Sequence, residues 1–169
     1  KGKLGKNLLV IGGSQGSRFI NTLVAKSISS LVDSGYIVYH QTGKKLYEET
    51  KKLYGDNLDK YKDSIHLEPY FEDIRSYYES SDVVICRSGS STVFELMYAK
   101  RPAIYIPLLS SAFNHQYYNA LYMKNLGLGD LMWGKDLTTY DLLGSLDYVY
   151  KSYSKYLEAV WRIRNDRLN

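Results

Sequence analysis

The sequence has a single cysteine, Cys86, and only 3 prolines among its 169 residues. One cysteine excludes an intrachain disulfide, and because Cys86 ends an apolar run we expect a buried thiol, consistent with a reducing compartment. No apolar run reaches the ~20 residues that a membrane-spanning helix needs, and the first residues show no signal-peptide pattern. Together these features predict a cytoplasmic protein.

Recognisable metal-binding patterns are also missing. The sequence has no C-x-x-C, no H-E-x-x-H and no Asp-x-Asp, which are spacings that hold a cation. We therefore expect neither a metal nor another cofactor. Basic residues are dispersed and the net charge is only +4, so no surface is predicted to bind nucleic acid.

Strand-like and helix-like patterns alternate along the chain. Short apolar runs predict strands at 7–11, 36–41, 65–68, up to Cys86, up to Pro107 and at 129–133. Apolar residues at helical spacing predict helices over 20–32, 46–54, 74–80, through Glu95, up to Leu126, over 138–150 and over 153–167. This alternation predicts an α/β fold with a parallel sheet and right-handed crossovers. Because 44% of the residues are hydrophobic and no linker interrupts them, we expect a single domain over residues 1–169.

The stretch from Val83 to Ala120 carries the clearest functional pattern. A turn at 87–92 follows one buried strand, and a polar loop ending at 114–116 follows the next. Both loops leave the carboxyl ends of parallel strands, where open α/β sheets bind ligands. Free backbone N–H groups at the two helix starts favour an anion. The stretch therefore predicts a nucleotide or nucleotide-sugar site.

Two turns rich in glycine and serine also admit other interpretations. The first, at 12–16, follows a strand but matches neither G-x-G-x-x-G nor a P-loop, so alone it favours a tight structural turn over a phosphate site. The second, at 89–93, nearly matches the G-x-S-x-G elbow of serine hydrolases, but Val93 replaces the last glycine and no base is placed beside it. We interpret its hydroxyls as helix caps that also hydrogen-bond a ligand.

Polar side chains after these turns have two interpretations each. Glu95 could stabilise a helix start by ~0.3–1 kcal/mol, or it could accept hydrogen bonds from two ribose hydroxyls, as the acidic residue of Rossmann sites does. The cluster Asn114-His115-Gln116 could be a solvated loop, or a set of donors and acceptors for a sugar. His115 could instead act as a base.

Five motifs together resemble a known family. They are GGSQGS at 12–17, HQTGK at 40–44, YFEDI at 70–74, CRSGSSTVFEL at 86–96 and NHQYYNA at 114–120. In order and spacing they resemble the C-terminal half of the MurG family, which transfers N-acetylglucosamine from UDP-GlcNAc to lipid I and makes lipid II of peptidoglycan. The resemblance covers nearly the whole chain. It implies a Rossmann-like parallel sheet flanked by helices, as the donor-binding half of a two-domain GT-B architecture.

The resemblance also assigns contacts to the nucleotide. Phe71 and Glu72 would lie against uracil, with Glu72 offering backbone groups to its edge. Glu95 would bind the ribose hydroxyls. Ser14 and Gln15, with neighbouring backbone N–H groups, would lie by the pyrophosphate.

The remaining assigned contacts concern the phosphates and the sugar. Ser90, Ser91 and Thr92 would line the pyrophosphate and the start of the sugar. His115 and Gln116 would hold the N-acetylglucosamine hydroxyls. Ser90 stands where the family commonly has alanine, and Phe113-Asn114 replaces a pair that usually contains an acidic residue, which bears on the sugar rather than on UDP.

No catalytic residue is assigned, because the family carries its presumed general base and its membrane-facing patch in the N-terminal half. The resemblance implies that such a half, or a partner chain, supplies the lipid-linked acceptor. The whole enzyme would then be peripheral on the cytoplasmic face of the plasma membrane. Two alternatives remain open: a UDP-binding subunit of a split glycosyltransferase, and an epimerase-like domain, which would need acid/base carboxylates that we do not find.

Overall fold

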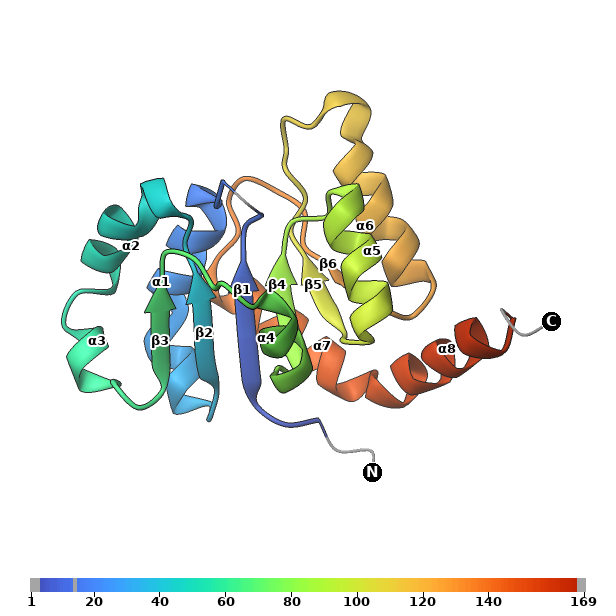
Figure 1. Cartoon of the computed structure of the whole chain (residues 1–169), viewed down its shortest axis with the longest axis horizontal. Coiled ribbons are helices and arrows are strands. Elements are labelled where there is room, and N and C mark those ends of the chain that lie inside the picture. Colours follow the sequence, from blue (N-terminus) through green and yellow to red (C-terminus); the bar gives the residue numbers. More distant parts are fainter. Residues whose placement is uncertain (1–3, 14, 167–169) are drawn as a thin grey trace.

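Six parallel strands form one sheet in the order β3-β2-β1-β4-β5-β6, with helices on both faces (Figure 1). The computed structural model describes residues 4–13 and 15–166. The strands are β1 (Asn7–Ile11), β2 (Ile37–Gln41), β3 (Ile65–Glu68), β4 (Val83–Cys86), β5 (Ala103–Tyr105) and β6 (Gly129–Leu131). The predicted α/β class, the parallel sheet and its alternation with helices are confirmed.

The helices follow the predicted ranges closely. They are α1 (Arg18–Asp33), α2 (Tyr47–Tyr54), α3 (Asn57–Lys60), α4 (Ile74–Ser80), α5 (Ser90–Ala99), α6 (His115–Asn125), α7 (Thr139–Lys151) and α8 (Tyr153–Asp166), with short 3-10 turns η1 (Lys44–Leu46) and η2 (Ala112–Asn114). The single-turn helix α3 was not expected, because it follows the break at Gly55. Strand β5 ends before Pro107, since the carbonyls of Ile106 and Pro107 accept hydrogen bonds from Arg87 instead of continuing the sheet.

The core forms two layers because successive strand residues point to opposite faces. Leu8 and Val10 face α1 and α7, whereas Leu9 and Ile11 face the side covered by α4, α5, α6 and α8. Cys86 belongs to the second layer and is fully buried, and burial raises the pKa of its thiol, so the expectation of a buried thiol is confirmed. Burial on both faces explains why the strands are continuous apolar runs.

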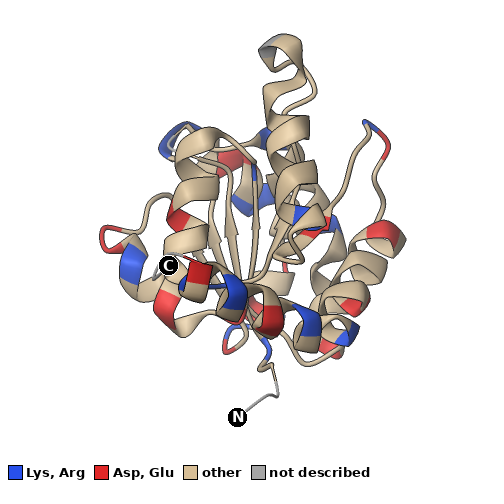
Figure 2. Ribbon diagram, turned by 90° about the vertical axis from the view of Figure 1, so that its right-hand side faces the viewer, with Lys and Arg blue, Asp and Glu red and all other residues tan. Residues whose placement is uncertain are grey.

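Charged residues of both signs are distributed over the domain (Figure 2). Figure 2 shows Lys and Arg interleaved with Asp and Glu along the ribbon. In the described part of the chain, no helix combines the length and apolar character required to span a bilayer.

A fully buried polar network lies where β2 meets α1 and α2. The His40 imidazole contacts the Tyr54 hydroxyl through Nδ1 at 2.7 Å and the Asn21 side-chain oxygen through Nε2 at 2.8 Å. The Asn21 amide in turn donates to the Thr42 carbonyl at 2.9 Å. With no acidic partner in this network, burial lowers the pKa of His40 to about 3, so the ring is neutral and satisfied on both nitrogens.

This burial predicts a pH-dependent stability. The folded-state pKa of His40 lies below its ordinary value of 6.5, so its contribution is present above pH 6.5 and is lost as the pH falls toward 3. Between these values the unfolded chain binds one more proton, which should lower the free energy of unfolding by roughly 1.4 kcal/mol per pH unit, or roughly 2 kcal/mol by pH 5. Urea titrations from pH 7.5 to 5 should show this slope, and His40→Gln should remove it.

The matched control is His66→Gln, because His66 is exposed on β3 and stacks on Tyr39. It should leave the slope unchanged. A His40→Gln slope equal to that of the parent chain would contradict the assignment.

Candidate functional site

The carboxyl edge of the sheet opens between β1 and β4. Strand order reverses at this point, since β2 and β3 lie on one side of β1 and β5 and β6 lie beyond β4. The loops that follow the two strands diverge at this switch point, which is the place where open α/β sheets form a ligand-binding crevice. In Figure 1 these loops, with the first turns of α5 and α6, lie along the top of the sheet.

The loop after β1 lies against the loop after β2 through two glycines. A Cβ on Gly16 would lie 2.2 Å from the Thr42 carbonyl oxygen, and one on Gly43 would lie 2.7 Å from the Gln15 carbonyl oxygen. Both glycines also have positive φ, +80° and +86°, which other residues adopt only with strain. The predicted tight turn is therefore real, and the Gln15 side chain is exposed at its tip. Ser14, predicted beside it, lies outside the described residues.

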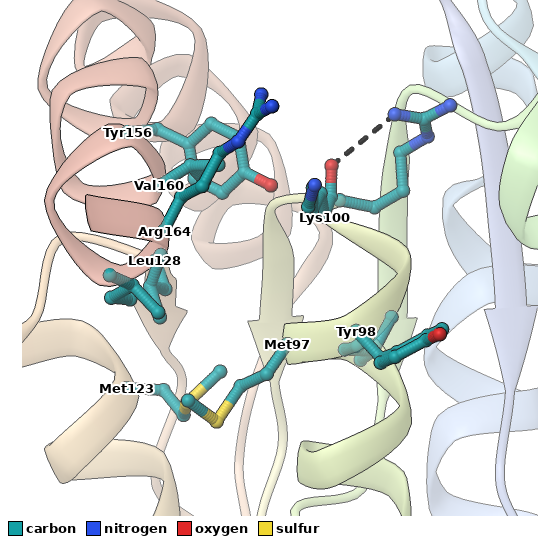
Figure 3. A pocket seen from close by; sticks show the side chains of 11 residues that line it. Met97, Tyr98, Lys100, Met123, Leu128, Tyr156, Val160 and Arg164 are labelled. Atoms are coloured by element: carbon teal, nitrogen blue, oxygen red, sulfur yellow. Dashed lines mark hydrogen bonds between the residues drawn. The ribbon is translucent and has the colours of Figure 1, made fainter. Parts of the chain in front are cut away.

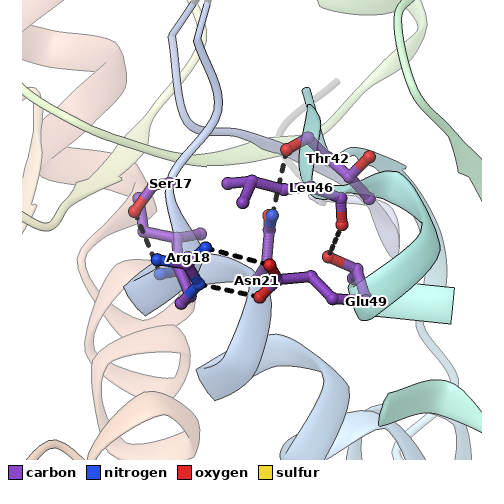
Figure 4. A network of polar contacts seen from close by, with 8 residues as sticks. Ser17, Arg18, Asn21, Thr42, Leu46 and Glu49 are labelled. Atoms are coloured by element: carbon purple, nitrogen blue, oxygen red, sulfur yellow. Dashed lines mark hydrogen bonds and ion pairs between the residues drawn. The ribbon is translucent and has the colours of Figure 1, made fainter. Parts of the chain in front are cut away.

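Polar side chains of α1 contact α2 and the Thr42 backbone next to these glycines (Figure 4). The Arg18 guanidinium donates two hydrogen bonds to the Glu49 carboxylate, at 2.8 and 2.9 Å, and so joins α1 to α2. Asn21, one turn further along α1, donates to the Thr42 carbonyl. The exposed Arg18–Glu49 ion pair contributes little to stability by itself. The buried Asn21 side-chain amide, by contrast, holds the backbone at Thr42 and Gly43 in place.

Arg87 joins three loops at the crevice. Its guanidinium donates to the Ile106 and Pro107 carbonyls at 3.1 and 3.0 Å and to the Ser17 hydroxyl at 2.8 Å. It is half-buried, burial lowers its pKa, and it forms no ion pair within the described residues. Its positive charge therefore remains available to an anion.

The start of α5 is open. Its N-cap is Gly89, which makes no side-chain cap hydrogen bond, so the expectation that the 90–92 hydroxyls cap this helix is wrong. The turn is held instead from α6, since the Ser88 hydroxyl donates to the Gln116 carbonyl at 2.7 Å and Asn119 donates to the Ser88 carbonyl at 2.9 Å. The first backbone N–H groups of α5 consequently have no capping side chain. Ser90 and Ser91 are exposed and Thr92 is half-buried in this turn.

Glu95 lies on the second turn of α5 and is oriented by α4. The buried Tyr78 donates its hydroxyl to the Glu95 carboxylate at 3.0 Å. Burial, reinforced by the Glu95 charge, raises the pKa of Tyr78, so this hydroxyl stays protonated as a donor. Because the hydrogen bond occupies one carboxylate oxygen, the exposed Glu95 can present the other to a ligand.

The loop after β3 presents backbone groups. The Phe71 ring is 4% exposed and stacks on Tyr77 at 3.9 Å between centroids, so it belongs to the core. Its backbone N–H donates to the Gln41 side-chain oxygen at 2.8 Å, which fixes the course of the loop, and Glu72 is exposed just beyond. Any ligand contact from Phe71 is consequently limited to its carbonyl and a small part of its ring.

The loop before α6 is strained and exposed. Phe113 and Asn114 have positive φ, +52° and +56°, and the Phe113 side chain is 90% exposed. Asn114 is the N-cap of α6 but makes no side-chain cap hydrogen bond. His115 is exposed, and the Gln116 side-chain oxygen accepts from the Leu108 N–H at 2.9 Å. Strain of this kind accumulates at ligand-binding sites.

The structure thus brings every described candidate residue to one edge of the sheet. Gln15 follows β1, Phe71 and Glu72 follow β3, residues 90–95 follow β4, and residues 115–116 follow β5. Sequence reasoning missed the supporting roles of Gln41, Tyr78 and Arg87, each of which acts on a residue distant in sequence. The described residues contain no group of three or more His, Cys, Asp or Glu side chains arranged to hold a metal.

Comparison with known proteins identifies the family. Residues 7–160 match the glycosyltransferase family 28 C-terminal domain. The chain belongs to this family. The resemblance inferred from the five motifs is thereby confirmed.

Curated relatives and solved structures agree with the family assignment. UDP-N-acetylglucosamine–N-acetylmuramyl-(pentapeptide) pyrophosphoryl-undecaprenol N-acetylglucosamine transferases from Francisella philomiragia and Nitratidesulfovibrio vulgaris are 36% and 34% identical, over 97% and 81% of this chain. The aligned part spans only 44% and 37% of those proteins. The crystal structure of Acinetobacter baumannii MurG superposes with a TM-score of 0.77 at 25% identity, over 92% of this chain and 45% of that one. The fold is that of one half of a GT-B glycosyltransferase, as expected.

The glycine contact between the two loops of this family 28 domain yields a stability prediction. Gly16→Ala should lower the free energy of unfolding by more than about 2 kcal/mol, because it adds a backbone clash to the strain of positive φ. Urea denaturation measures the loss. The matched control is Gly35→Ala, since Gly35 has φ +91° but open space around its Cβ position, and it should cost only about 1 kcal/mol. Equal losses in the two variants would show that the contact with Thr42 is unimportant.

Proposed function

We propose that this chain is the donor-binding domain of a glycosyltransferase that moves N-acetylglucosamine from UDP-GlcNAc to a lipid-linked acceptor. The acceptor would be lipid I and the product lipid II of peptidoglycan synthesis. The arrangement of α5 is the observation that carries the proposal. Its first turn, which has no side-chain cap, begins three residues after Arg87, which forms no ion pair among the described residues, and Glu95 follows on the next turn, oriented by Tyr78. A pyrophosphate and a ribose diol attached to it need such a pair of sites side by side.

Each remaining candidate residue has a role in this proposal. Gln15 and the backbone around Gly16 meet the pyrophosphate from the opposite side of the crevice. Phe71 and Glu72 lie against uracil, and the backbone of Glu72 meets its edge. Ser90, Ser91 and Thr92 line the phosphates, and His115 and Gln116 hold the sugar hydroxyls. Ser14 retains its proposed place beside Gln15.

The leaving UDP would be stabilised without a metal. Helix-start N–H groups and the Arg87 guanidinium supply fixed positive charge where negative charge develops on the departing phosphate. The acceptor hydroxyl would need a base, and we propose that an N-terminal half or a partner chain provides it together with the lipid-binding surface. That assembly would be peripheral on the cytoplasmic face of the plasma membrane.

Domain organisation leads to the central test of the proposal. The 169-residue chain alone should bind UDP-GlcNAc in the presence of EDTA, because all the proposed contacts come from its own loops. It should not transfer the sugar, because no base or acceptor surface is assigned to it. Calorimetric titration measures binding, and a radiolabelled transfer assay on a lipid I analogue measures activity with and without a MurG-type N-terminal half. Turnover by the chain alone, or no binding of UDP at millimolar concentration, would contradict the proposal.

Glu95 supplies a residue-level prediction. Glu95→Gln should weaken UDP binding by about 10- to 100-fold, because it removes a charged acceptor worth roughly 1.5–3 kcal/mol. Thermal unfolding should be little changed, since the side chain is exposed. Calorimetric titration with UDP provides the measurement.

The matched control for this prediction is Glu72→Gln. The substitution is the same, but the proposed contact of Glu72 comes from its backbone, so UDP affinity should be retained. Equal affinities of the two variants for UDP would remove Glu95 from the ribose site.

A further inference from the structure

A cavity lies at the opposite end of α5 from the proposed donor site. It has a volume of about 340 Å³. Its walls are the end of α5, Met123 of α6, Leu128 just after α6, and α8 (Figure 3). Small-molecule pockets start at ~300 Å³, so the cavity is large enough for a ligand of modest size. None of the residues assigned to UDP-GlcNAc lines it.

The wall of the cavity is apolar and adaptable. Leu96 and Met123 are 1% exposed and Leu128 is 5% exposed, and Met97 and Ile163 complete the wall. Figure 3 shows the two methionine side chains lying next to each other. Methionine side chains are flexible and polarisable, so they accommodate alkyl groups of varied shape.

One buried polar group in this wall lacks a partner. Tyr156 of α8 is only 5% exposed, and its hydroxyl makes no hydrogen bond to any described residue. In Figure 3 the hydroxyl points from α8 toward the end of α5. Burial raises the pKa of Tyr156, against a smaller opposing effect of Arg101, so the hydroxyl is protonated and can donate. A buried hydroxyl without a partner is costly, and a ligand oxygen in the cavity would satisfy it.

The rim of the cavity is cationic. Lys100, Arg101 and Arg164 line it, and no acidic residue does. Arg101 is occupied by the carbonyls of Tyr78 and Glu79, at 3.0 and 2.7 Å. Lys100 and Arg164, however, form no ion pair within the described part of the chain. The positive charges of Lys100 and Arg164 therefore lie beside the apolar cavity without a paired carboxylate among the described residues.

We propose that this cavity binds a single-chain anionic amphiphile, such as a medium-chain carboxylate. The alkyl chain fills the space between Met97, Met123 and Ile163. The carboxylate accepts from the Tyr156 hydroxyl and is neutralised by Lys100 and Arg164. Inorganic phosphate would gain nothing from the apolar wall, and a neutral alcohol would gain nothing from the two cations, so a ligand that combines an alkyl chain with an anionic head fits best.

Calorimetric titration of the chain with octanoate tests the proposal. Octanoate should bind in a 1:1 ratio with a Kd below about 1 mM, at least tenfold tighter than 1-octanol, and inorganic phosphate should give no heat. Flotation of the protein with phosphatidylglycerol vesicles tests the alternative ligand, an anionic lipid within a bilayer. Binding to vesicles without binding of octanoate would overturn the proposal, and so would equal affinities for octanoate and 1-octanol.

Charge-removing variants locate the carboxylate. Lys100→Asn combined with Arg164→Gln should weaken octanoate binding by at least about tenfold, as loss of hydrogen bonds to a charged group does. Asparagine is chosen because Lys100 has φ +56°, which asparagine tolerates. Arg162→Gln is the matched control, since Arg162 pairs with Glu158 and does not line the cavity. Unchanged octanoate affinity in the double variant would refute the cationic rim.

The hydroxyl is tested separately. Tyr156→Phe should weaken octanoate binding by at least about threefold without lowering the melting temperature, because the hydroxyl it removes has no partner in the protein. Tyr105→Phe is the control, since the Tyr105 hydroxyl is also buried and unpartnered among the described residues but does not line the cavity. UDP titration of the same variants should give unchanged affinities, which separates this cavity from the donor site. Equal octanoate affinity in the parent and Tyr156→Phe would remove the hydroxyl from the site.

Discussion

The carboxyl edge of the sheet depends on one half-buried guanidinium. Arg87 holds the backbone that follows β5 through two carbonyls and the start of α1 through the Ser17 hydroxyl. Hydrogen bonds from a charged donor contribute roughly 1.5–3 kcal/mol each, and here they join segments about 20 and 70 residues apart in the chain. Because no described carboxylate neutralises the charge, the same group that orders the loops also attracts an anion to them.

A second support acts from the side of β2. The neutral His40 ring fixes Asn21, and Asn21 fixes the Thr42 carbonyl against which Gly16 packs. The two glycine loops therefore rest on a buried polar network rather than on an apolar surface. Such a network specifies one arrangement, because any displacement leaves a buried donor or acceptor unsatisfied. Loops held in this way can present backbone N–H groups at a fixed position, as binding a pyrophosphate requires.

Helix α5 connects the two ends of the domain. Its first turn is open at the crevice, and Glu95 on the second turn is oriented by Tyr78. Near its end, Leu96, Met97 and Tyr98 border the cavity beside α8, and so does Lys100 just beyond the helix. One ten-residue helix thus serves the proposed donor site at its amino end and borders the proposed amphiphile site at its carboxyl end.

The sequence by itself determined the strands, the helices other than the single-turn α3, and the loops that carry the site. These follow from local patterns: apolar runs for strands buried on both faces, helical spacing for the helices, and glycines where the backbone must turn or approach closely. The five ordered motifs were enough to predict the family. Tertiary structure alone decided the contacts between distant residues. Phe71 lies in the core, where its ring stacks on Tyr77. The 90–92 hydroxyls do not cap α5, and the turn before it is held by α6 through Ser88. The Tyr156 hydroxyl is buried on α8 with no hydrogen-bond partner among the described residues. No local pattern encodes such contacts, since each depends on where a remote element packs.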